Sequence, residues 1–496
     1  MGLFNPKSWF KKSSPAPRRK RSYAGAGMNR LIADWIGGSS SANREIRPAL
    51  STLRNRSREL ARNHWIAQRA LQIYRTQVVG DRGLSLQVRA RNIPGPQETE
   101  GKLDGSGNRI VEENWKQWTR RGVCEVTGAH SWIDIQKLVI ESIVRDGEIL
   151  IHFVRNADNK FRFQLQLLEA DFLDEGLNKE LEDGKRIVMG VELNKLGRAI
   201  AYYLWKGPAH PYDNVEYYQS SKHVRVPAEN MLHVFHPERA EQTRGVPLFS
   251  GVLNKIQMLD GFEEAELVAS RLAASKSLFL KSDDSESGYD GDSFEGTYAP
   301  VMDAEPGSIT SLPPGVDLAP WNPDHPTSAY ADFHKSVLRG ISSGIGLDYV
   351  SVANNLEGVS YSSIRQGTID TRDNFRMNQR FLIEHVAEPI YREWLKTSII
   401  SGALPFPINR FDKFANAAEF RGRGYQWVDP SKEVRASIDA LNNGFISYSD
   451  VQMQYGRDPE EVFSSLQSDK DMAERYGIKL ALEPLGSKAP ALPEID

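Results

Sequence analysis

One stretch, residues 327 to 400, constrains the fold more than any other part of the sequence. An amphipathic run over Tyr330–Arg339 is followed by glycines at 340, 344 and 346, and then by a polar segment over residues 351–358. A long helical pattern opens at residue 360. The sequence therefore predicts two helices that frame a glycine-softened polar loop.

The second of these helices carries a row of arginines at spacings of seven, four and four residues, which places them near one helical face. A basic row behind a polar loop is typical of a surface that faces a polyanion. Ion pairs with acids of the same helix, such as Asp370 and Glu384, explain the row equally well, so both interpretations stay open. The arginines are Arg365, Arg372, Arg376 and Arg380.

Bulk composition is that of an ordinary globular protein. The chain has 496 residues, enough for about two to four domains, with 40% apolar and 26% charged residues and a net charge of −3. One cysteine, Cys124, excludes an internal disulfide and is expected to be buried and structural. No apolar run approaches the roughly 18 to 20 residues that cross a bilayer, and the first residues lack an apolar signal core. We therefore expect no membrane partner and no secretion.

Two segments are strongly biased in charge. Residues 1 to 30 hold eight Lys or Arg and no acid, which predicts a basic arm that is either a solvated tail or an anchor on nucleic acid or an acidic partner. Residues 281 to 306 form an acidic insertion. It includes Asp283, Asp284, Glu286, Asp290 and Asp292.

The periodicity predicts an α+β fold. Helices are expected at 49–79, 109–120, 131–145 and 246–275, and short strands joined by hairpins between 148 and 236. The first helix is expected to be apolar on one side and to present an arginine face, from Arg54 to Arg75, on the other. Small capped helices follow from Asp429-Pro430 onward.

Few motifs offer catalytic chemistry. The phosphate-binding loop of an ATPase is absent from the sequence. A metal-dependent nuclease could use Asp171, Asp174 and Lys185, although residues 182–185 read more simply as a hairpin turn. His233 and His236 lie three apart on a strand and point to opposite faces, which disfavours a shared metal. We therefore predict no catalytic residue, no metal and no cofactor.

The order of several motifs resembles the lambda-type family of portal proteins of tailed bacteriophages. No single motif is decisive, but together they extend over residues 45 to 480. They are Arg56–Asn63 with Gln77–Gly80, Leu168–Asp171, Gly190–Asn194 with Gly197–Tyr203, His233–His236 with Arg244–Leu248, Tyr361–Arg365 with Trp394, Trp427–Pro430 and Gly444–Ser447.

The resemblance implies a portal fold with seven parts: a basic arm (1–45), a β-rich wing (46–246), a first stem helix (247–277), a clip with the acidic insert (278–322), a second stem helix (323–347), a tunnel loop and tunnel helix that return to the wing (348–425), and a helical crown (426–496). It also implies a dodecameric ring at one capsid vertex, in the virion and, during assembly, in the host cytoplasm.

The same resemblance implies roles for individual residues. The tunnel loop would line the DNA channel through Ser351, Val352, Asn354, Asn355 and Glu357. The tunnel-helix arginines would form ion pairs or face phosphates. Glu263, Glu264 and Glu266 would face the stem lumen, and the acids of the insert would dock the motor or adaptor.

The partners implied are further copies of the chain, terminase, major capsid and scaffolding proteins, head-completion and tail adaptor proteins, and double-stranded DNA bound without sequence specificity. A loop with few charges would touch DNA weakly, since dense phosphate neutralisation would hold it tightly. Two other functions stay open: a capsid-associated nuclease, and a monomeric DNA-binding scaffold that uses the basic arm and the arginine faces.

Overall fold

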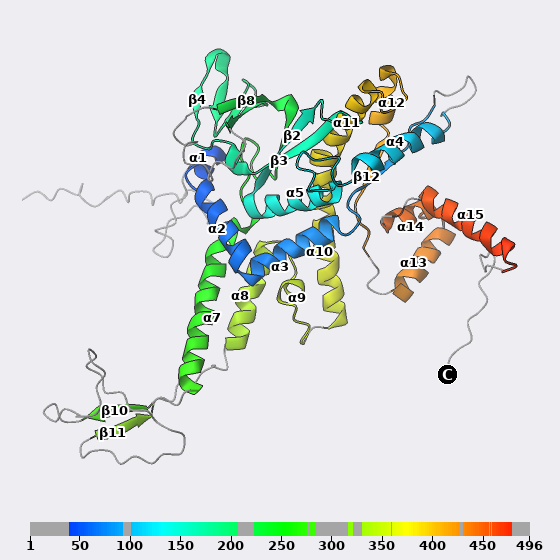
Figure 1. Cartoon of the computed structure of the whole chain (residues 1–496). Coiled ribbons are helices and arrows are strands. Elements are labelled where there is room, and N and C mark those ends of the chain that lie inside the picture. The colour runs from blue at the N-terminus through cyan, green and yellow to red at the C-terminus, as the bar shows by residue number, and fades with distance from the viewer. Residues whose placement is uncertain are drawn as a thin grey trace, which may run out of the picture.

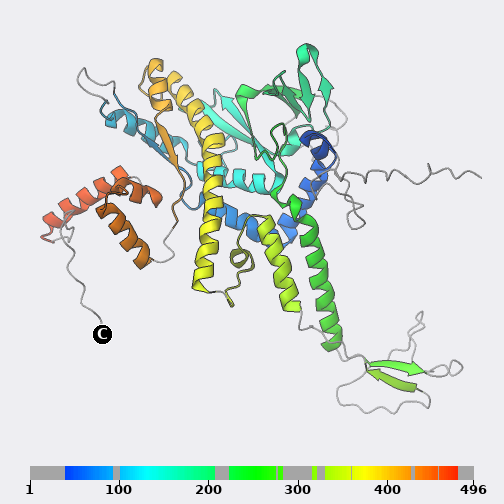
Figure 2. The same ribbon diagram turned by 180° about the vertical axis from the view of Figure 1, so that it is seen from behind.

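The computed structural model describes residues 39–92, 101–206, 223–274, 278–282, 316–320, 330–358, 360–425, 430–455, 457 and 459–478. A central body of helices and sheets carries two long helices, α7 and α8, which run side by side away from it (Figures 1 and 2). The two-stranded β10–β11 sheet lies beyond their far ends, and a group of three helices, α13 to α15, lies beside the body. The α+β fold class is confirmed.

The predicted helix over 49–79 is interrupted. After α1 (Ala42–Ile46), α2 (Leu50–Asn63) ends at His64, and α3 (Trp65–Tyr74) continues into a π-helical turn (Arg75–Val79). His64 has extended backbone angles, φ −115° and ψ 126°, and its Nδ1 accepts a hydrogen bond from the Ile66 amide. His64 therefore ends one helix and caps the next, a role that helical periodicity alone does not reveal.

Two further helices lead into the first sheet. After β1 (Ser85–Val88) come α4 (Gly105–Trp118) and α5 (Trp132–Asp146), close to their predicted positions. Ser131 and Asp134 form a capping box at the start of α5, and Gly147 ends it at φ 89°. Strand β2 (Glu148–Arg155) begins at the next residue, so the chain turns from helix to strand within one glycine.

Two antiparallel sheets follow, as the hairpin signals predicted. Strands β3 (Phe163–Leu168), β2 and β9 (Met231–Phe235) form one sheet in the order β3-β2-β9. The second sheet runs in sequence order through five strands. They are β4 (Lys179–Glu180), β5 (Arg186–Val188), β6 (Val191–Leu193), β7 (Ala199–Trp205) and β8 (His223–Pro227).

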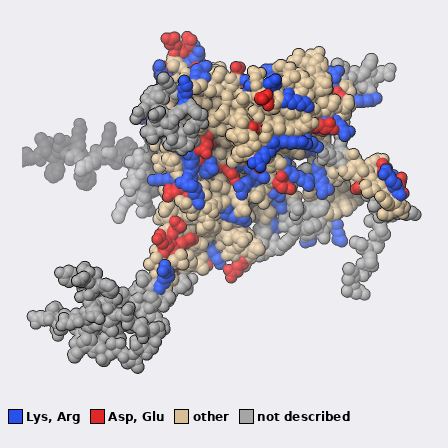
Figure 3. All heavy atoms as spheres, in the orientation of Figure 1, with Lys and Arg blue, Asp and Glu red and all other residues tan. Residues whose placement is uncertain are grey.

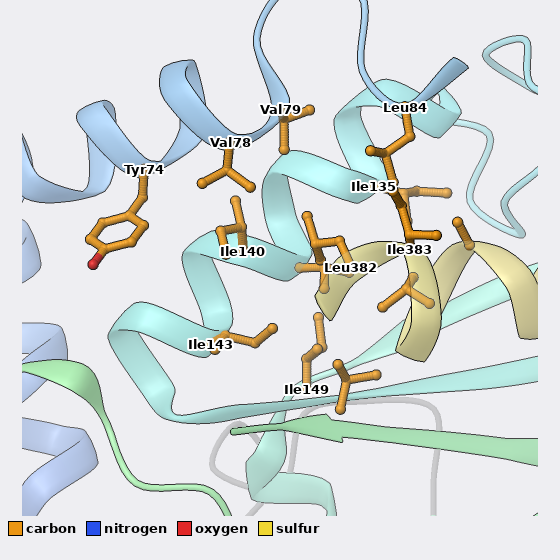
Figure 4. Close-up of a cluster of buried hydrophobic side chains, with 14 of the residues drawn as sticks. Tyr74, Val78, Val79, Leu84, Ile135, Ile140, Ile143, Ile149, Leu382 and Ile383 are labelled. Atoms are coloured by element: carbon orange, nitrogen blue, oxygen red, sulfur yellow. The ribbon is translucent and has the colours of Figure 1, made fainter. Parts of the chain in front are cut away.

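The main core lies between α3, α5, the β3-β2-β9 sheet and the later helix α11. Figure 4 shows its aliphatic part, where Val78 and Val79 face Ile140 of α5 and Leu382 and Ile383. A group of buried aromatic rings continues it, with the Trp115 and Trp394 centroids 5.0 Å apart. Burial of this size fixes the helices against the sheet, because each large aromatic removes much apolar surface from water.

The second half of the chain is mostly helical. A short 3-10 turn (Leu248–Gly251) precedes α7 (Leu253–Ala274), so the predicted helix over 246–275 starts later than expected. Pro247 explains the delay, because proline disfavours helical geometry at the preceding Val246 and is itself extended at ψ 137°. Strands β10 (Leu278–Ser282) and β11 (Val316–Pro320) pair with each other, and α8 (Tyr330–Gly344) then returns to the body.

The remaining elements end the described chain. α10 (Tyr361–Leu382), a π-helical turn (Ile383–Ala387) and α11 (Glu388–Ile400) form one long helical run. α12 (Phe411–Ala415) follows, and β12 (Ala418–Arg421) pairs with β1. The last helices are α13 (Pro430–Asn442), α14 (Tyr448–Gln454) and α15 (Pro459–Arg475). Gly444 at φ 73° and a capping box at Ser447 separate α13 from α14.

Candidate functional site

The polar segment between α8 and α10 is only partly a loop. Residues 349–353 form a short helix, α9 (Tyr349–Ala353), which the sequence did not predict. The Asp348 carboxylate caps this helix by accepting a hydrogen bond from the Ser351 amide at 2.7 Å. Asn354 ends it in the left-handed conformation at φ 50°, a backbone shape that asparagine tolerates well.

Three side chains from other helices hold the segment in place. The Tyr74 hydroxyl of α3 donates to the Ile345 carbonyl at 2.8 Å, and the Asn374 amide of α10 donates to the Gly346 carbonyl at 2.9 Å. Arg69 Nε, also from α3, donates to the Ser351 carbonyl at 3.0 Å. α9 is thus fixed between two helices that are about 280 and 25 residues away in sequence.

The predicted channel residues fall into two groups. Val352 is only 2% exposed and belongs to the main core, in contrast to the expectation that it lines a channel. Val352 is buried because the helical turn of α9 directs this side chain toward the core. Ser351 and Asn355 are half-buried, while Asn354 and Glu357 are exposed. Leu356, which the sequence analysis did not select, is 65% exposed at the tip.

The arginine row lies on α10 as predicted, and two of its members form ion pairs within the helix. Arg376 pairs with Asp373 at 2.7 Å, and Arg380 pairs with Glu384 at 2.5 Å. All four of these side chains are between 43% and 69% exposed, so water screens both pairs. Arg365 and Arg372 are half-buried.

A cluster that the sequence analysis missed lies beside this row. The guanidinium carbons of Arg372, Arg376 and Arg423 lie 5.4, 5.8 and 5.5 Å from the ring centre of Tyr425. Burial raises the pKa of the Tyr425 phenol to about 12, despite the three cations nearby. The alternating string Arg421-Gly-Arg-Gly-Tyr425 was the signal that marked this cluster in the sequence.

Acidic residues on α7 include the three predicted for the stem. Figure 3 shows acidic atoms gathered over α7 and basic atoms spread across the central body. Glu264 is exposed and Glu266 half-buried. Glu263 instead lies 2.5 Å from Nε2 of His334 on α8, a contact that joins the two long helices. The acids predicted to dock a motor, Asp283, Asp284, Glu286, Asp290 and Asp292, lie outside the described residues.

The expected arginine face of the first helix is partly wrong. Arg54 is 2% exposed and donates to Glu148 at 2.9 Å and to Asp171 at 3.3 Å. Arg58 pairs with Asp171 at 2.6 Å and with Asp146 at 2.8 Å. These arginines point into the protein because they neutralise carboxylates that α5, β2 and the segment after β3 bring there.

Glu148 is the centre of this buried ion network. Arg244, which is fully buried, binds both of its carboxylate oxygens, and Nε2 of His233 lies 2.8 Å away. Burial alone would raise the pKa of Glu148, but Arg244 and His233 outweigh it and hold that pKa well below the usual range. Arg244 also donates to the carbonyls of Ala170 and Met189. The network joins the sheets to the residues that lead into α7.

The residues considered for a nuclease are engaged elsewhere. Asp171 is held by Arg54 and Arg58, and Asp174 lies 2.9 Å from Nε2 of His223. Asp183 adopts φ 59° in the turn before Lys185, which supports the hairpin-turn interpretation. Over the described ranges, no group of three or more His, Cys, Asp or Glu side chains is placed to hold a metal ion.

The remaining single residues also have structural surroundings. His233 faces Glu148, whereas His236 stacks on Phe381 with ring centres 3.8 Å apart, so the two histidines do not converge. Cys124 is buried, and burial raises the pKa of its thiol to about 12, as expected for a structural cysteine. None of the helices in the described part of the chain combines the length and apolar character needed to span a membrane.

Comparison with known proteins gives one consistent family. The family model described as "Phage portal protein, lambda family" matches residues 28–379. A probable portal protein of Halomonas phage phiHAP-1 is 33% identical over 467 residues, which cover 93% of this chain and 88% of the relative. Portal protein B of Escherichia phage lambda is 24% identical over 483 residues, which cover 89% of this chain and 87% of the relative.

Among solved structures, the neck of a native gene transfer agent (GTA) particle, computed with C12 symmetry, is similar with 11% identity and a TM-score of 0.41. The match covers 81% of this chain and 94% of that one. The family assignment itself comes from the sequence matches, which extend across α1 to α10 and, in the relatives, over most of the chain. The chain therefore belongs to the lambda family of phage portal proteins and is a structural component of the phage head.

Proposed function

We propose that copies of this chain close into a ring, expected to be a dodecamer, at one vertex of the capsid, and that DNA enters and leaves the head through its bore. The family match over residues 28–379 carries this proposal. In this assignment the protein acts as a conduit and docking platform, with no catalytic step of its own. Terminase, head-completion and tail adaptor proteins, and the capsid and scaffolding proteins, are its partners.

The arrangement of the long helices supports the ring. α7 and α8 leave the body as a pair, and they are assigned as the stem, with the β10–β11 sheet as the clip. Several apolar side chains on this pair remain exposed: Met258 by 75%, Leu267 by 66% and Phe333 by 52%. Neighbouring copies would cover such residues, because apolar surface of this extent favours association.

The tunnel segment supports a channel in which this loop itself holds DNA only weakly. Its exposed residues are Asn354, Leu356 and Glu357, which offer one acid and no base. Repeated around a ring, such a loop would contact DNA weakly, since affinity for the phosphate backbone requires Lys or Arg. α13 to α15 are assigned as the crown, and the sheets with α2 to α5 as the wing.

Electron microscopy of the purified protein tests the ring directly. The expected result is annular particles viewed down a symmetry axis, and twelve copies in native mass measurement. Solitary particles under all buffer conditions, combined with strong salt-dependent DNA binding, would instead identify a monomeric DNA-binding scaffold.

Deleting residues 354–358 tests the channel loop. This deletion spares α9, whose Val352 is part of the core, so ring assembly is expected to persist while packaging or genome retention declines. The control is a deletion of equal length in the exposed turn around Leu196, which is 93% exposed on the wing. Full heads at normal titre from the 354–358 deletion would rule out the loop's role.

A further inference from the structure

The cluster around Tyr425 is held rigidly by the body of the protein. The Tyr425 hydroxyl donates to the Gln77 carbonyl at 2.9 Å, and Arg423 donates to the Thr76 carbonyl. Both carbonyls belong to the π-helical turn after α3, whereas Arg372 and Arg376 come from α10. Three guanidinium groups from two separate segments therefore converge on one aromatic ring, whose face attracts cations.

Two glycines make this convergence possible. A Cβ atom on Gly422 would lie 2.6 Å from the side chain of Gln379, and one on Gly424 would overlap the backbone of Tyr455. The alternating glycines let the segment from Arg421 to Tyr425 pass between α10 and α14, so that Arg423 reaches the arginines of α10.

Carboxylates only partly balance the positive charge at this site. Asp373 pairs with Arg376, but both side chains are at least 60% exposed, and an exposed pair within one helix contributes little. Arg372 lies over the Tyr425 ring and interacts electrostatically with Glu433. Burial lowers the pKa of Arg372, nearby Glu433 counteracts this, and Arg376 and Arg423 lower it further. Three arginines thus face two nearby carboxylates, Asp373 and Glu433, and the cluster keeps a positive excess.

We propose that Arg372, Arg376 and Arg423, gathered around Tyr425, bind phosphate groups of duplex DNA without reading its sequence. This inference rests on the proposed function as a DNA conduit and adds a defined contact outside the tunnel loop. Guanidinium groups suit phosphate because they offer several N–H donors in a fixed plane. Because water screens the ion pair between Arg376 and Asp373, Arg376 would exchange this carboxylate for a DNA phosphate at a small cost in free energy.

The length of the basic row favours DNA over a carboxylate of a second copy. From Arg365 to Arg380 the row extends over sixteen residues of α10, or about 22 Å at the rise of an α-helix. A single carboxylate occupies one arginine, whereas duplex DNA presents a charge about every 1.7 Å along its axis. A linear polyanion is therefore the better match.

Salt titration of DNA binding tests the site. A fluorescent duplex of about twenty base pairs is titrated with assembled wild-type protein and with an Arg372→Gln/Arg423→Gln double variant, over a range of salt concentrations. The slope of log affinity against log salt should fall by about 2 in the variant, since each lost phosphate contact removes about 0.9. Affinity should fall about tenfold or more, equally for two unrelated DNA sequences.

Two further variants make the result specific. Arg82→Gln/Arg109→Gln removes the same charge from side chains that are 81% and 80% exposed, and it should leave the slope unchanged. Arg372→Lys/Arg423→Lys keeps the charge and should restore most of the slope. If the Gln variant proves unstable in a thermal melt, comparison of this Lys variant with the wild type still measures the guanidinium contribution, with weaker affinity at a similar slope expected.

Other outcomes overturn the proposal. A Gln variant that binds DNA with the wild-type slope, or that loses no more than the Arg82/Arg109 control, excludes the phosphate site. Loss of ring assembly with unchanged DNA binding would assign the arginines to carboxylates of a second copy. If the Gln variant loses binding of inorganic phosphate but keeps the wild-type affinity for duplex DNA, the cluster binds free anions only. A variant that still forms rings and packages DNA, yet keeps its slope, overturns this site and leaves the conduit intact.

Discussion

Two arginine-rich regions of the molecule use the same side chain in opposite ways. Around Glu148, Arg54 and Arg244 are 2% exposed or less, and carboxylates of the same chain oppose the charge of both guanidinium groups. On α10, Arg376 and Arg380 are at least 60% exposed and pair only with acids one turn away. The first region is an internal support, and the second is available for a partner.

Removing the Glu148 carboxylate should reduce the free energy of unfolding more than any other change considered. Glu148→Gln leaves Arg244 buried without its carboxylate partner and leaves Arg54 with Asp171 at 3.3 Å and Glu175 at 3.9 Å, and breaking a buried pair in this way costs about 3–5 kcal/mol. Chemical denaturation of wild type and variant measures the loss. A change below about 1 kcal/mol would mean that the network contributes little to stability.

Truncating the buried Val352 side chain should cause the next largest loss of stability. Val352→Ala removes two methyl groups from the core and should cost about 1–3 kcal/mol, while releasing α9 from α3. Leu356→Ala, four residues away at the exposed tip, is the matched control and should be nearly neutral. Hydrogen exchange of the 349–353 amides reports the release. Equal protection in both variants would contradict the docked helix.

Acid should remove the stabilisation that the Glu148 carboxylate provides. The pKa of folded Glu148 lies below its unfolded value near 4.5, so its contribution is present above that pH and is lost as the pH falls below it. Denaturation midpoints measured from pH 7 down to pH 3 should therefore fall more steeply in wild type than in Glu148→Gln. Parallel pH profiles would contradict this assignment.

Breaking an exposed ion pair of the α10 row should cause the smallest loss of stability. Glu384→Gln breaks the exposed pair with Arg380, and such a pair is worth about 0.3–0.5 kcal/mol. The melting temperature should change by a degree or less, and added salt should abolish the difference. A large loss would show that this part of the row is also structural.

The same contrast explains what the sequence could predict. Periodicity located α7, α8 and α10, and turn residues located the hairpins, because those signals are local. The burial of Arg54 was missed because its partners Glu148 and Asp171 are 94 and 117 residues away. α9 was missed for a similar reason: a helix of five residues depends on Arg69 and the core, not on its own sequence.

The glycines beside the ion network have a consequence for motion. A Cβ on Gly147 would lie 2.5 Å from the Val246 carbonyl carbon, and one on Gly245 would overlap the Gly147 carbonyl. The helix-to-strand turn before β2 and the entry to α7 are therefore in direct main-chain contact. Because neither glycine leaves room for a Cβ atom, this contact ties any tilt of α7 to the start of β2.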